Sequence, residues 1–120
     1  FMKKTVDLGV TEKVHILAGV GPLKSSRMAR FLNEKIPGIV IPEELLQRMD
    51  SAVQGIDESD KEARREAWRA EGMSICIEQI EELREIEGIA GVHIMAIEWE
   101  AAIRPIVERL GLLPRPDLSC

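Results

Sequence analysis

The chain has 120 residues, of which 45% are hydrophobic and 31% are charged, and its formal net charge is −5. This length suits one small domain, and the apolar fraction suffices for a core. The negative charge argues against nucleic-acid and membrane-surface partners, and no apolar run approaches the roughly 18 residues that a membrane span needs. The chain opens on Phe1 rather than an initiator methionine, so we read it as an internal fragment, a processed chain or an expression artefact.

The first elements lead into an apolar strand. Residues 1–9 read as the last turns of a helix, and the nearly unbroken apolar run 14–20 follows. Such a run is typical of a parallel strand that is covered on both faces. Gly21-Pro22 breaks the run, and Ser25 or Ser26 can cap the next helix by accepting a backbone hydrogen bond.

Three amphipathic helices are predicted before the next strand. The first stops at Pro37-Gly38, the second begins at Pro42, and the third begins at Asp57 or Ser59 and is interrupted or bent near Gly72. Their apolar stripes are Met28, Phe31, Leu32 and Ile36; Leu45, Leu46, Met49 and Val53; and Met73, Cys76, Ile77, Ile80 and Leu83. The glutamates on the outside of the third helix read as a solvated face rather than as paired catalytic carboxylates.

A second strand is predicted over 91–97, followed by a helix over 102–110. Pro105 is awkward inside that helix, so the helix either kinks there or its regular part starts close to Arg104. Strands that alternate with helical crossovers predict an α/β fold with parallel strands. Two parallel strands leave edges uncovered, and a closed (βα)₈ barrel takes about 250 residues. The chain therefore supplies about a quarter of such a barrel.

The residues themselves show no catalytic constellation, and no catalytic residue or metal ligand is assigned. His15 and His93 lie in apolar strands, where packing under a helix is favoured over a ligand pair. Cys76 and Cys120 lack metal-ligand spacing and read as a buried thiol and a loose chain end, which indicates a reducing, cytoplasmic setting. Trp99 is of more interest, because it follows a strand at the end where α/β barrels build their sites.

Four segments, in order and with plausible spacing, resemble the C-terminal part of the methylenetetrahydrofolate reductase barrel. They are Ile16-Leu17-Ala18-Gly19-Val20-Gly21-Pro22-Leu23-Lys24-Ser25, Pro37-Gly38-Ile39-Val40-Ile41-Pro42, Gly88-Ile89-Ala90-Gly91-Val92-His93-Ile94-Met95 and Gly111-Leu112-Leu113-Pro114-Arg115-Pro116. The resemblance covers nearly the whole chain, so residues 1–120 are expected to be one fragment of a single TIM-type barrel domain.

The resemblance implies a flavin-dependent oxidoreductase of one-carbon metabolism and methionine biosynthesis. Its members reduce 5,10-methylenetetrahydrofolate to 5-methyltetrahydrofolate with FAD, most of whose site is expected outside this chain. One wall of the folate pocket remains here. The expected substrate-binding residues are Gly19, Gly21, Pro22, Ala96, Ile97, Glu98 and Trp99. Family members carry a T-L-N-R-like sequence where this chain has Ala96-Ile97-Glu98-Trp99, so an arginine that helps bind folate is replaced by a flat indole.

Two other functions stay open at this point. The chain can be a non-enzymatic interaction or dimerisation module derived from such a barrel, or another barrel enzyme of the same ancestry, for example a corrinoid or methyl-transfer protein. Expected partners are folate and the missing barrel segments or a partner chain, in an oligomer, with no nucleic acid and no membrane. The sequence does not indicate the electron donor or whether the substrate is an ordinary folate. Sequence upstream of Phe1 would discriminate among these functions.

Overall fold

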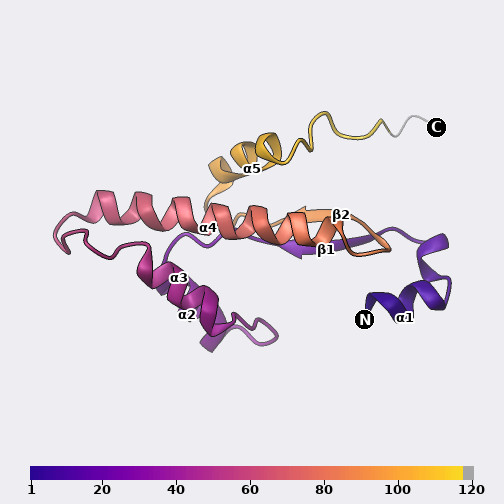
Figure 1. Ribbon diagram of the computed structural model, residues 1–120, viewed down its shortest axis with the longest axis horizontal. Helices are drawn as coiled ribbons and strands as arrows, with labels where there is room; N and C mark the ends of the chain where they lie inside the picture. Colours follow the sequence, from indigo (N-terminus) through magenta and orange to yellow (C-terminus); the bar gives the residue numbers. More distant parts are fainter. Residues whose placement is uncertain (118–120) are drawn as a thin grey trace.

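A computed structural model describes residues 1–117 and shows two parallel strands among five α-helices (Figure 1). In chain order the elements are α1 (Met2–Asp7), the 3₁₀ turn η1 (Val10–Glu12), β1 (Ile16–Val20), α2 (Ser26–Lys35), α3 (Glu43–Ser51), α4 (Lys61–Arg84), β2 (Ile89–Ile94), η2 (Glu100–Ala102) and α5 (Ile103–Arg109).

The predicted pair of parallel strands is confirmed. β1 and β2 are neighbours in one sheet, with Ala18 opposite Val92 and Val20 opposite Ile94. The three helices between them form the crossover that parallel strands require. Figure 1 shows α4 lying along the sheet, and α4 contacts both strands. The structure thus shows an α/β layer with the order of elements that the sequence predicts.

Among the described residues, helices cover only one face of the sheet, so cover of the second face stays a prediction that concerns segments outside this chain. Val20, Val92 and Ile94 pack toward α4 in the larger core cluster. The opposite face carries Leu17, which is 58% exposed, and His93, which is also exposed.

The two histidines contradict the prediction that they pack under a helix. His15 and His93 are both exposed, and neither is packed under a helix. His15 precedes Ile16, which pairs with Ile89, whereas His93 pairs with Gly19. The two side chains are therefore separated by several positions along the sheet and do not form a ligand pair. His93 lies in an apolar strand sequence because its neighbours Val92 and Ile94 pack in the core cluster that includes residues of α4.

Helix α4 is continuous over 24 residues, so the predicted interruption near Gly72 is wrong. Gly72 is buried, and a Cβ atom built on it would lie 1.7 Å from the backbone oxygen of Leu23. Gly72 therefore allows the backbone of Leu23 to approach α4 closely, and it does not break the helix. The predicted inner stripe of α4 is confirmed, because Cys76, Ile77 and Ile80 are buried in the larger core cluster.

The helix boundaries agree in part with the sequence. Ser25 caps α2 by accepting a hydrogen bond from the backbone N–H of Met28 at 3.1 Å. Asp60, not Asp57 or Ser59, caps α4 by accepting one from Ala63. The predicted stripe of α2 is only partly correct, since Phe31 is 54% exposed and Ile36 lies beyond the helix. Pro42 precedes α3 as its N-cap, and Pro105 falls in the first turn of α5, where it breaks no hydrogen bond.

The open sheet face predicts that the isolated 120-residue chain associates. Leu17 and the free edges of β1 and β2 present apolar surface and unpaired backbone groups to solvent. We expect light scattering to show dimers or larger species, and Leu17→Lys to reduce them because a charge on that face opposes pairing. A monodisperse monomer that unfolds cooperatively would contradict this expectation.

Candidate functional site

The loops after the two strands meet at one end of the sheet. β1 ends at Val20 and β2 at Ile94, and parallel strands bring their carboxyl ends to the same edge. The backbone N–H of Met95 donates to the Val20 oxygen at 2.8 Å, which continues the pairing one step into the loop. A Cβ atom on Gly21 would lie 2.7 Å from the Met95 oxygen, so only glycine permits this approach.

A cavity of about 370 Å³ lies at this edge. Four of the predicted site residues line it together: Gly19, Gly21, Pro22 and Ile97. The remaining wall is apolar except for Gln79 and consists of Val20, Leu23, Met28, Leu32, Ile39, Val40, Ile41, Pro42, Leu45, Ile75, Gln79 and Met95. This volume and lining suit a small, largely apolar ligand.

Sequence reasoning missed the contribution of the segment between α2 and α3. Residues 39–42 line the cavity although they belong to no helix or strand. The backbone N–H of Ile41 donates to Oδ1 of Asn33 at 2.8 Å, which ties this segment to α2. The sequence signal for this contribution was the apolar run Ile39-Val40-Ile41 between Pro37 and Pro42. A short apolar segment outside helices and strands is expected to pack against another part of the protein.

The other three predicted site residues do not line the cavity. Ala96 and Glu98 lie in the loop after β2, and Glu98 has a φ of 53°, an uncommon angle for a residue with a side chain. Trp99 is 9% exposed and belongs to the larger core cluster with Ile77 and Ala102 of the neighbouring elements. The guanidinium of Arg69 lies 5.6 Å from the centre of its ring, a cation–π contact.

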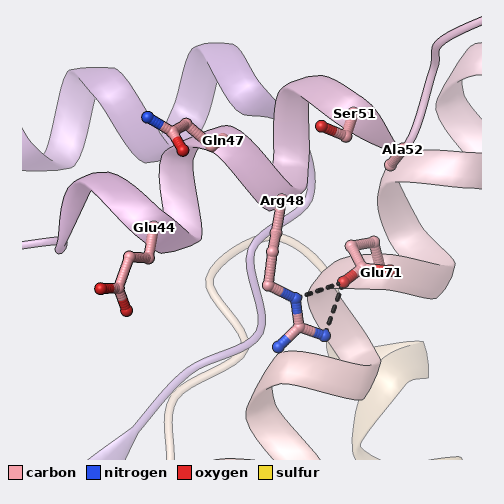
Figure 2. A pocket seen from close by; sticks show the side chains of 6 residues that line it. All are labelled: Glu44, Gln47, Arg48, Ser51, Ala52 and Glu71. Atoms are coloured by element: carbon pink, nitrogen blue, oxygen red, sulfur yellow. Dashed lines mark hydrogen bonds and ion pairs between the residues drawn. The ribbon is translucent and has the colours of Figure 1, made fainter.

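A second hollow, of about 410 Å³, lies on the surface between α3 and α4 (Figure 2). Arg48 points from α3 toward α4 and donates to Glu71 at 2.8 Å through Nε and to Glu78 at 2.6 Å through Nη1. The two carboxylates raise the pKa of the Arg48 guanidinium, and the guanidinium lowers the pKa of Glu78. Because Arg48 is already paired with two carboxylates, its charge joins α3 to α4 and is not available to an anionic ligand.

The described residues offer little reactive chemistry. Burial raises the pKa of the Cys76 thiol to about 11, so it stays protonated and unreactive, as the sequence indicated. Cys120 lies outside the described residues. Within residues 1–117 no three His, Cys, Asp or Glu side chains come together as a metal site. The helices of this part of the chain are also too short or too polar to cross a membrane.

The fold is thus that of an α/β protein with an apolar cavity at the carboxyl ends of its parallel strands, the place where such folds bind ligands. The particular family follows from comparison. Residues 1–111 match the family model described as methylenetetrahydrofolate reductase, and the chain belongs to that family. This confirms the resemblance found in the sequence and places the chain among folate-related oxidoreductases. No curated protein matches the chain.

Proposed function

We propose that the chain is the C-terminal part of a (βα)₈ barrel that reduces 5,10-methylenetetrahydrofolate to 5-methyltetrahydrofolate with FAD. The observation that carries this proposal is the apolar cavity between the two strand-end loops, in a chain whose first 111 residues match the reductase family. Gly19, Gly21, Pro22 and Ile97 are its proposed folate wall, which excludes water from the ring. Ala96, Glu98 and Trp99 continue that wall in sequence but lie outside the cavity.

The residues present do not fit FAD as a whole. FAD carries a diphosphate, and Gln79 supplies the only polar side chain among the described residues that line the cavity. Phosphate binding calls for cationic groups or a cradle of backbone N–H groups. We therefore propose that the flavin is held by barrel segments or a partner chain outside these 120 residues, in a reducing cytoplasmic oligomer.

The proposal is tested by comparing the isolated chain with the complete protein in which it occurs. We expect the isolated chain to be colourless and inactive, because most of the flavin site is elsewhere. The complete protein should keep a flavin absorption band through gel filtration and oxidise reduced flavin with methylenetetrahydrofolate. A yellow isolated chain would contradict the division of the site, and a complete protein without folate-dependent turnover would overturn the proposed reaction.

The open sheet face supports one alternative, a non-enzymatic interaction module. Leu17 and His93 on that face are exposed, and a partner can cover them as well as a barrel can. If the flanking gene sequence encodes no further barrel strands and the purified chain forms a stable, flavin-free complex, this alternative holds instead.

A further inference from the structure

An ion pair joins the two strand-end loops one residue beyond the cavity wall on each side. Leu23 and Ile97 line the cavity, and the residues that follow them directly are Lys24 and Glu98. Nζ of Lys24 lies 3.5 Å from Oε2 of Glu98. The cavity thus has a largely apolar wall, and a cation–anion contact joins the two loops beside it.

The two partners of this ion pair are held very differently. The Lys24 side chain is 27% exposed, whereas that of Glu98 is 86% exposed. Exposed ion pairs contribute little to stability, so replacing the Glu98 carboxylate by another anion costs little. The positive φ of Glu98 adds backbone strain at this position, and such strain concentrates at functional sites.

Lys24 itself is fixed from both sides. The backbone of Leu23 lies directly against Gly72 of α4, and Ser25 caps α2 through the Met28 N–H. The backbone that carries Lys24 therefore needs no reordering when an anion binds, and the Lys24 side chain is already largely shielded from solvent. Lys24 is therefore the preorganised member of the pair, and Glu98 is the exchangeable one.

We propose that Lys24 binds the carboxylate tail of the folate substrate. In the absence of substrate, Glu98 forms an ion pair with Lys24, and the substrate tail replaces the Glu98 carboxylate. This inference rests on the proposed function. A flat ring in the apolar cavity with a carboxylate beyond its edge matches the two ends of a folate, a pterin ring and a glutamate tail. Lys24 thereby selects for substrates that carry the tail, and the competing carboxylate of Glu98 lowers the affinity that the tail contributes.

The test measures binding of two probes to the complete protein by calorimetry. Tetrahydrofolate carries the glutamate tail, and 6-methyltetrahydropterin lacks it. Lys24→Gln should weaken tetrahydrofolate binding about tenfold, the scale of a lost hydrogen bond to a charged group, and change pterin binding less than twofold. Lys24→Arg should restore most of the affinity. Glu98→Gln should tighten tetrahydrofolate binding about twofold to fivefold, because the competing anion is gone.

Lys35→Gln is the matched control, since it removes a cation from the end of α2 away from the loops. It should leave both affinities unchanged, and melting curves of all variants check that each is folded. Unchanged tetrahydrofolate binding in Lys24→Gln overturns the inference while leaving the proposed function intact. Equal losses for both probes assign Lys24 a structural role and also overturn it. If the unmodified complete protein binds neither probe, the proposed function fails and the inference fails with it.

Discussion

Gly72→Ala is expected to destabilise the protein by about 3 kcal/mol, the upper end of the cost of overpacking. An added Cβ atom would lie 1.7 Å from the Leu23 oxygen, a main-chain atom that cannot turn aside. Either α4 or the loop after β1 must shift. In an ordinary helix interior the same substitution would stabilise by about 1 kcal/mol, so the sign of the effect identifies the close approach. Chemical denaturation of the complete protein measures it.

Ala70→Gly on the same helix is the matched control. Ala70 is exposed and mid-helix, so the change should cost only about 1 kcal/mol through helix propensity. Because Leu23 lines the cavity, Gly72→Ala should also raise the folate KM, whereas Ala70→Gly should leave it unchanged. A Gly72→Ala protein as stable as the parent would show that the loop does not depend on this contact.

Gly72 also shows where the sequence becomes ambiguous. A glycine within a charged helical segment reads as a break, because glycine is a poor helix former. The burial of Gly72 against Leu23 depends on a contact between residues 49 positions apart, which no local pattern encodes. The apolar stripe of α4 was predictable for the opposite reason. Its spacing of three and four is local, and the helix presents that stripe to the sheet.

The strands could be predicted, but their faces could not. Apolar runs located β1 and β2 to within a few residues, yet they did not show which side chains face the helices, and His93 was expected to pack under a helix. In the structure Val92 and Ile94 pack toward α4 and His93 lies on the open face. In a nearly unbroken apolar run, alternation carries no information about which face meets the helix.

The candidate site was predicted in part for a related reason. The family resemblance implied Gly19, Gly21, Pro22 and Ile97, and the parallel strands bring the loops that carry them to one edge of the sheet. The wall from residues 39–42 depends on how the link between α2 and α3 folds back, which spacing does not specify. Trp99 was assigned to the pocket because it follows a strand, but η2 begins directly after it and turns its indole toward the core.

Trp99→Ala is therefore expected to act mainly on stability, with a loss of about 3 kcal/mol or more in the free energy of unfolding. The indole is 9% exposed and packs in the larger core cluster, so its removal leaves a cavity among buried side chains. Trp99→Phe should lose less, because a ring of smaller volume remains, although the contact with Arg69 is weakened. Thermal and denaturant melts of the complete protein compare the two variants.

Steady-state kinetics on the same variants decides whether Trp99 also contacts folate. Ile106→Ala provides the reference, because Ile106 is fully buried in the same cluster but comes from α5 rather than from the loop. Its loss should be about 2–5 kcal/mol. If Trp99 is structural, both alanine variants should show a folate KM within about twofold of the parent, a difference of roughly 0.4 kcal/mol. A KM that rises for Trp99→Ala, recovers in Trp99→Phe and stays unchanged in Ile106→Ala would instead place the ring on the substrate.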